Sequence, residues 1–296
     1  MAMTHLLSQT VWRKPAVLVG ALTAILCGAP AHSGERLSGT WGVSQIEGAG
    51  GGGLVPWALI TGSGSRDAVG AIAFATRTRT RGGFGLNVVG AAVGLYDSVE
   101  LSLAQWRFGL SDTVPGQSLK LNVAGLKWRV FGDAVYDQDK PWPQIAIGAQ
   151  FKHNPEFAIP AALGAAHAHD SDFYVAATKV WLAGLAGHNT LANLTLRSSR
   201  ANQFGLLGFG GPQSDRRSWR AELSLAVMLC DDLALGGEWR DKPNNLASFR
   251  EDRATDLFAA WFVNRHLSLT LAWVDLGNVA NKPGQRGAYL SVQGAL

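Results

Sequence analysis

The chain has 296 residues, of which 47% are hydrophobic and only 16% are charged, whereas about a quarter of the residues in a soluble domain are charged. Its 26 basic and 22 acidic residues give a net charge of +4, too small to indicate a nucleic-acid-binding surface. After the N-terminal region no apolar run approaches the roughly 18 residues of a spanning helix, which excludes helical membrane spans. An apolar chain without such a helix favours a membrane β-barrel.

Residues 1–33 have the features of a secretory signal peptide. Arg13 and Lys14 precede an apolar stretch over residues 16–26, and small residues follow as far as Ser33. The stretch is far shorter than the roughly 20 residues of a spanning helix. We therefore expect cleavage near residues 31–33 and export. The mature chain keeps Cys230 as its one cysteine, which excludes an intramolecular disulfide.

Residues 34–67 form a glycine-rich N-terminal segment. From Trp41 to Gly64 it reads WGVSQIEGAGGGGLVPWALITGSG, with four consecutive glycines and no regular alternation. Glycine permits backbone conformations and close approaches that other residues do not. Three interpretations stay open: a flexible leader, an extra hairpin that would bring the barrel to fourteen strands, or a plug folded into the lumen.

From residue 68 onward, apolar and polar residues alternate, as in strands whose two faces meet different media. In SVELSLAQ (residues 98–105), Val99, Leu101 and Leu103 lie on one face, and Glu100 and Ser102 occupy the other. We predict an all-β fold: a transmembrane antiparallel up-and-down β-barrel over residues 68–296, with about twelve strands in a range of 10–14. The predicted strands are 68–78, 84–95, 99–108, 119–130, 144–152, 173–183, 192–197, 220–229, 233–240, 256–263, 267–273 and 287–296.

The predicted strand 119–130 changes phase. At its start, Lys120 lies on the polar face and the leucines on the other. Past Gly125 the pattern reverses, so that a regular strand would turn Lys127 and Arg129 toward lipid. We predict a β-bulge at Gly125, which would correct the phase.

Long and short links alternate between the predicted strands, as short periplasmic turns and long outer loops do in membrane barrels. The stretches 153–172 and 198–217 are the longest, and two links break the rule: 79–83 is short for an outer loop and 131–142 is long for a turn. An even strand count places both ends of the barrel on the periplasmic side.

A soluble β-sandwich or can is the alternative fold. Its water-facing side would be charged, but the polar faces here consist mostly of small, mild residues. Several tryptophans also lie near strand ends, where an interfacial girdle would place them. These are Trp106, Trp128, Trp142, Trp239 and Trp273.

The block SQIEGAGGGGLVPWALI (residues 44–60), with the Tyr96-Asp97 turn and the strand after it, resembles an uncharacterised family of exported Gram-negative proteins. That family is a domain of unknown function assigned to outer-membrane barrels. The resemblance implies the fold, the cell outer membrane as location, and outer-membrane lipid and the barrel-assembly machinery as partners. It supplies no ligand and no catalytic residue. Outer-membrane barrels commonly end in an aromatic residue, whereas this chain ends in Leu296.

Charged residues on the polar faces are the main candidates for function. We consider two interpretations: ion pairs between neighbouring strands, which we favour, or the lining of a weakly anion-leaning pore. The predicted lumen-facing residues are Glu100, Lys120, Lys152, Arg197, Arg220, Glu222, Glu238 and Arg240.

Two further constellations are weaker. His167, His169 and Asp170 have the spacing of a metal site in a long loop, where a solvated loop tip is the simpler interpretation. Ser198 and Ser199 with His188 or His266 would suit a hydrolase, but no G-x-S-x-G motif is present. No phosphate-binding loop follows the glycine run.

We therefore expect a passive, porin-like channel for a small solute that the sequence does not identify. The alternatives are a non-conducting structural or binding barrel that acts through its outer loops and, less favoured, an outer-membrane hydrolase. We expect no enzymatic activity, no cofactor and no nucleic-acid partner.

Overall fold

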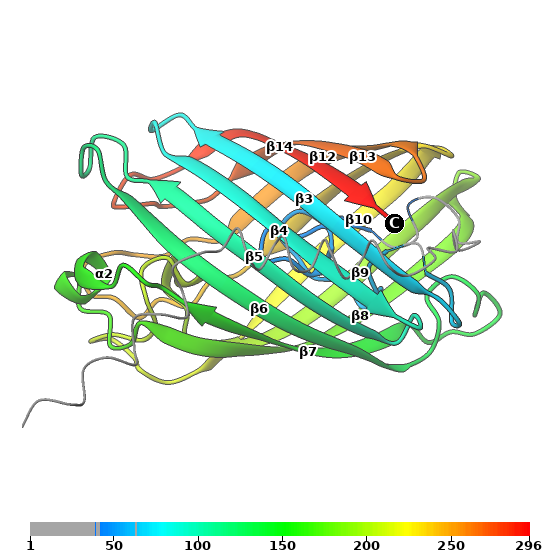
Figure 1. Ribbon diagram of the computed structural model, residues 1–296, viewed down its shortest axis with the longest axis horizontal. Coiled ribbons are helices and arrows are strands. Elements are labelled where there is room, and N and C mark those ends of the chain that lie inside the picture. Colours follow the sequence, from blue (N-terminus) through cyan, green and yellow to red (C-terminus); the bar gives the residue numbers. More distant parts are fainter. Residues whose placement is uncertain (1–38, 40–41, 63) are drawn as a thin grey trace, which may run out of the picture. The chain divides into compact units, whose positions relative to one another are not determined.

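Twelve antiparallel strands close into a barrel in the computed structural model, which describes residue 39 and residues 42–62 and 64–296 (Figure 1). Each strand pairs with its neighbour in the chain, and the last pairs with the first. The predicted up-and-down barrel of twelve strands is confirmed. The strands are β3 (Val69–Thr80), β4 (Gly85–Leu95), β5 (Val99–Gly109), β6 (Ser118–Phe131), β7 (Gln144–His153), β8 (His169–Leu185), β9 (His188–Ser199), β10 (Ser218–Cys230), β11 (Leu233–Arg240), β12 (Ala254–Asn264), β13 (Leu267–Asp275) and β14 (Arg286–Ala295).

The two-residue alternation of the sequence sorts side chains onto two faces of the wall. In β5, Glu100 and Ser102 are buried, whereas Leu101 and Leu103 are 50% and 39% exposed. The same division recurs in the other strands, so leucine, valine, phenylalanine and tryptophan cover much of the outside. The buried inner face carries polar and charged side chains together with apolar ones such as Phe74 and Trp106.

Strand β6 departs from the prediction. Leu119 and the two apolar residues that alternate after it are buried on the inner face, and the alternation continues through Gly125 to the buried Lys127. The register with β5 is continuous there, and the irregularity falls instead between Arg129 and Phe131 in the pairing with β7. The predicted bulge at Gly125 is wrong because the leucines at the start of β6 pack against the interior, not against lipid.

The two ends of the barrel differ in their connections. At one end the turns are tight, as at residues 96–98, 186–187 and 231–232, and the longer link 132–143 also lies there. The other end carries the links 154–168, 200–217 and 241–253, and the helix α2 (Ala158–Ala162) lies in the first of them (Figure 1). We call these the short-turn end and the long-loop end. No helix in the described part of the chain is long and apolar enough to cross a membrane.

Residues 42–62 lie inside the barrel, and every one of them is buried. Figure 1 shows their blue trace between the near strands β3–β6 and the far strands. Within this segment, β1 (Val43–Ser44) and β2 (Gly50–Gly51) form a two-stranded sheet of their own. The described part is therefore neither a hairpin of the wall nor an unpacked leader. We call residues 42–62 the internal segment. The predicted signal peptide, residues 1–33, lies outside the described residues.

Two glycines explain how closely the internal segment approaches the wall. A Cβ atom at Gly52 would lie 2.0 Å from Oε1 of Glu238 on β11, and one at Gly94 on β4 would lie 2.1 Å from the carbonyl oxygen of Thr61. At Gly94 the obstacle is backbone, and at Gly52 a side chain would have to displace the Glu238 carboxylate. The glycine run of the sequence therefore serves close backbone packing.

The link between β9 and β10 folds back into the barrel from the long-loop end. It contains the short 3-10 helix η1 (Asn202–Gly205), and its Phe204 and Phe209 are buried. Phe204 packs against Trp106, with ring centroids 6.1 Å apart. This link and the internal segment together fill space that the wall encloses.

The tryptophans divide between the two faces. Trp106 is fully buried and donates a hydrogen bond to the carbonyl oxygen of Ile46, at 2.6 Å, so its predicted place in an outer girdle is wrong. Trp128 and Trp142 are exposed near the short-turn end, and Trp273 is exposed near the long-loop end. Trp106 lies in phase with Glu100, and the position of a residue near a strand end does not by itself fix its face.

Candidate functional site

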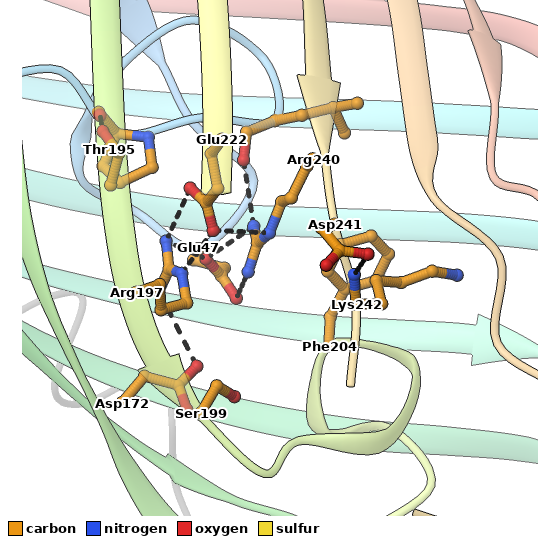
Figure 2. Close-up of polar contacts among 12 residues, drawn as sticks. Glu47, Asp172, Thr195, Arg197, Ser199, Phe204, Glu222, Arg240, Asp241 and Lys242 are labelled. Carbon is orange, nitrogen blue, oxygen red and sulfur yellow. Dashed lines mark hydrogen bonds and ion pairs between the residues drawn. The ribbon is translucent and has the colours of Figure 1, made fainter. Parts of the chain in front are cut away.

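Six charged side chains meet inside the barrel, and none is more than 4% exposed. One comes from the internal segment and five from the neighbouring strands β7, β8, β9, β10 and β11. Three are cations and three are anions, so the group is electrically neutral. Figure 2 shows five of them, four from separate strands of the wall and Glu47 from the internal segment. This group, which we call the charge network, comprises Glu47, Lys152, Asp172, Arg197, Glu222 and Arg240.

Glu47 of the internal segment is the centre of the network. Arg240 holds it in a two-pronged contact, with Nη1 2.9 Å from Oε2 and Nη2 3.0 Å from Oε1. Lys152 Nζ donates to Oε1, and Arg197 Nη2 lies 3.5 Å from Oε2. Gln45 adds a hydrogen bond of 2.8 Å from the same segment. The hydrogen bonds from Arg240 and Lys152 are strong because donor and acceptor are both ionised.

The wall residues also neutralise one another. Arg197 Nε donates to Glu222 Oε1 at 2.5 Å, and Arg240 Nε lies 3.1 Å from the same oxygen. Lys152 Nζ donates to Asp172 Oδ2 at 2.6 Å. Each buried charge therefore faces opposite charge, the arrangement that a buried ion needs to offset its lost hydration.

A second ion pair anchors the backbone of the internal segment. Glu100 and Lys127 are direct register partners on β5 and β6, with Oε2 and Nζ 2.9 Å apart. The two Glu100 oxygens accept hydrogen bonds from the N–H groups of Gly50 and Thr61. Lys127 Nζ donates to the carbonyl oxygens of Gly50 and Leu59. The pair thereby satisfies polar backbone groups that would otherwise be buried without partners.

The internal segment is fixed at further points around the ring. Its Leu54 N–H donates to Glu238 on β11 at 2.5 Å, and its Ala58 N–H donates to Thr178 on β8 at 2.7 Å. Thr195 on β9 donates to the carbonyl oxygen of Pro56 at 2.8 Å. These contacts lie on β8, β9 and β11, and the Glu100–Lys127 pair lies on β5 and β6, across the ring from β11. Together they hold the segment across the lumen.

A buried pair in the loops holds the inward link at the long-loop end. Lys242 Nζ lies 3.1 Å from Oε2 of Glu251, and the N–H of Gln203 donates to the other oxygen of Glu251 at 2.9 Å. Burial raises the pKa of the Glu251 carboxyl, while the charge of Lys242 opposes the rise. Phe204 of the same link stacks on the Arg240 guanidinium, 4.6 Å from ring centroid to Cζ. The link therefore covers the charge network.

The structure brings most of the predicted lumen-facing residues into these contacts. Arg220 shares the inner phase of Glu222 but lies nearer the strand end, where it pairs with Asp241 at 3.0 Å. The prediction that Lys120 faces the lumen is wrong. Lys120 lies on the outer face of β6, where it pairs with Glu156. Because the first leucines of β6 turn inward, their polar neighbour turns outward. The residues that are buried inside the barrel are Glu100, Lys152, Arg197, Glu222, Glu238 and Arg240.

The predicted metal-site residues do not converge. His167 lies 3.1 Å from Asp215, whereas the buried Asp170 is held by Arg200 and Arg217. His169 contacts the rings of Phe151 and His153 on the outside of the wall. Within the described residues, no three His, Cys, Asp or Glu side chains are grouped as metal ligands.

The predicted hydrolase residues are also separated. His188 begins β9 at the short-turn end, and Ser199 ends it at the long-loop end. At about 3.3 Å per residue these two side chains lie roughly 35 Å apart. His266 instead contacts the carbonyl oxygen of Ala295 at 3.0 Å.

Sequence reasoning missed Glu47 and Lys127. Between residues 37 and 65, Glu47 is the one charged residue, and such an isolated acid in a glycine-rich apolar segment is a signal for a buried ionic contact. Lys127 was obscured by the phase reversal that the sequence places at Gly125. Both residues depend on contacts between distant parts of the chain, which the alternation of single strands does not reveal.

Comparison with known proteins gives a family but no curated relative. The family described as "Protein of unknown function (DUF3034)" matches residues 40–293. No curated protein matches.

Among solved structures, the NanC porin is 9% identical, with a TM-score of 0.47, over 75% of this chain and 98% of the porin. Omp33 of Acinetobacter baumannii is 8% identical, with a TM-score of 0.40, over 77% of this chain and 97% of Omp33. The COG4313 outer membrane channel of Pseudomonas putida F1 is 11% identical, with a TM-score of 0.37, over 81% of this chain and 96% of the channel.

Proposed function

Because the chain belongs to the DUF3034 family, whose function is unknown, we propose a function from the geometry: an outer-membrane β-barrel that its own internal segment keeps closed. In its resting state this barrel is not an open passive channel. The observation that carries the proposal is the complete burial of residues 42–62 within the ring of strands. The outer surface, with Leu257 and Trp273 at 70% and 59% exposure, supports a place in lipid.

The contacts of the internal segment support a closed state that is stable. The charge network is neutral and its members face one another, so it offers no free charge to a passing ion. Breaking it by removing one partner would leave an uncompensated buried charge, which costs about 3–5 kcal/mol. A lumen held in this way differs from the water-filled interior of an open porin.

A conditional channel is the second candidate function. The observation that favours it is that β1 and β2 pair only with each other. The internal segment therefore supplies no strand to the ring. The segment could therefore leave without opening a gap in the wall. The solute that would then pass is not indicated by the structure.

Single-channel conductance in planar bilayers tests both functions. We would compare the refolded chain from residue 34 with the chain from residue 64, after checking that both form heat-modifiable barrels. The closed-barrel proposal expects a silent intact protein. Conductance steps from the intact protein at moderate voltage would contradict it.

The shortened chain separates the two functions. If it conducts, and a synthetic peptide of residues 40–62 closes it again, the internal segment is a removable plug and the conditional channel is supported. If it folds but stays silent, the conditional channel is wrong and the barrel acts without conducting.

A further inference from the structure

Four cationic side chains lie together on the outer face of β3, β5 and β6, near the long-loop end. Arg77, Asn87, Arg107 and Lys120 are successive register partners across the neighbouring strands β3–β6. Arg79 lies two residues beyond Arg77 on the same face of β3. In Figure 1 these strands run side by side across the near wall. We call Arg77, Arg79, Arg107 and Lys120 the cationic patch.

Three members of the cationic patch have free guanidinium groups. Among the described residues, Arg77, Arg79 and Arg107 are exposed and enter no ion pair or hydrogen bond, while Lys120 pairs with Glu156. The short-turn end offers a contrast, since Arg129 there pairs with Asp97 at 2.7 Å. Unpaired arginines next to an apolar wall leave positive charge available for a ligand.

The patch lies where the outer surface changes from apolar to polar. The next outward row toward the short-turn end is mixed, with Ala75, Val89, Gln105 and Asn122. The row after it is apolar, with Ala73, Ala91, Leu103 and Ala124. In a membrane, apolar rows contact acyl chains and the first charged row beyond them meets lipid headgroups. The unpaired arginines therefore stand at headgroup level on the side of the long loops.

A surface depression accompanies the patch. It has a volume of about 680 Å³ and is lined by Arg77, Arg79, Arg81 and Arg107, together with residues of the β3–β4 and β5–β6 links. Arg77 and Arg107 are two strands apart, roughly 10 Å, and Arg77 and Arg79 are roughly 7 Å apart along the strand. Flexible arginines at these spacings can close on one headgroup that bears more than one phosphate.

We propose that the cationic patch binds the phosphate groups of an anionic glycolipid in the outer leaflet, of the lipid A type. The proposal rests on the outer-membrane location proposed above. Arginine suits this ligand because its planar fork donates two parallel hydrogen bonds to a phosphate. The acyl chains would then extend toward the apolar row that contains Leu103, which favours a lipid over free phosphate.

Native mass spectrometry of the full folded chain in detergent tests the proposal, with lipid A and dephosphorylated lipid A as probes. The test variant is Arg77→Ala/Arg107→Ala. The matched control is Arg250→Ala/Arg265→Ala, which removes two exposed charges from a loop and from a turn at the other end. We expect lipid A to bind the test variant about thirtyfold more weakly and the control unchanged. Equal loss in both variants, or equal binding of dephosphorylated lipid A, would overturn the proposal.

Further measurements distinguish a lipid from a soluble anion, and failure of this proposal from failure of the proposed function. Inorganic phosphate at millimolar concentration should not displace lipid A; full displacement would assign the patch to a soluble anion instead. Conductance of the intact protein would contradict the closed barrel but would not affect lipid A binding, because the patch lies on the outside of the wall. Failure of the chain to enter bilayers would contradict the location on which both proposals rest.

Discussion

Glu47 shows how one residue can fix a whole segment. It is the sole carboxylate that the internal segment places in the charge network, and three wall cations surround it. Without it, Lys152, Arg197 and Arg240 would face only Asp172 and Glu222. Since these side chains are buried, the remaining positive charge would have no partner.

We therefore expect Glu47→Gln to lower the free energy of unfolding by about 3–5 kcal/mol, measured by urea unfolding of the refolded protein. The double variant Glu47→Gln/Lys152→Met removes one charge of each sign and should recover part of this loss. Equal stability of wild type and Glu47→Gln would mean that the network does not hold the internal segment.

At the scale of elements, glycines allow the internal segment and the wall to pack closely against each other. A side chain at Gly52 would have to displace the Glu238 carboxylate, whereas a Cβ at Gly85 on β4 would meet its nearest atom only at 4.0 Å. The two glycines therefore make a test and a control. One lies where the segment touches the wall, and the other lies at an open strand end.

Gly52→Val should displace the internal segment while leaving the ring of strands intact. We expect limited proteolysis to cleave this variant within residues 42–62 and to spare the wild type and Gly85→Val. Heat-modifiable migration on gels should persist in all three proteins. Resistance of Gly52→Val to the protease would indicate that the segment and wall can adjust to a side chain at this contact.

Much of the wall could be predicted from the sequence, because a two-residue period depends on neighbours in the chain. Strand β5 shows this, with Glu100 inside and Leu101 outside as the alternation indicates. Strand β6 shows the limit: a leucine turned toward a packed interior and a leucine turned toward lipid have the same pattern. The partners of Glu47 could not be predicted either, since Arg240 lies 193 residues away in the chain.

At the scale of the whole molecule, the barrel has an apolar outside and a filled inside. Exposed tryptophans lie toward both ends, with Trp128 and Trp261 near the short turns and Trp219 and Trp273 near the long loops. Trp106 is enclosed. Two outer belts and a separate inner tryptophan are what a barrel seated in a bilayer would have.

Fluorescence quenching by brominated lipids checks this placement. We expect Trp273→Phe to remove part of the quenchable emission of the protein in liposomes, because the exposed indole would contact lipid in the proposed location. Trp106→Phe should remove emission that the bromines do not reach. If the two variants lose the same quenchable fraction, the barrel does not sit in the bilayer in this way.

The neutral network inside the barrel also has a consequence for assembly. The internal segment leaves the ribosome before any strand of the wall, and Ser44 within it contacts Gln293 on β14, the strand that completes the ring against β3. The carboxylate of Glu47 joins Lys152, Arg197 and Arg240, which come from three different strands. The segment can act as a template on which the wall is laid down, and the ring closes around a core, not around water.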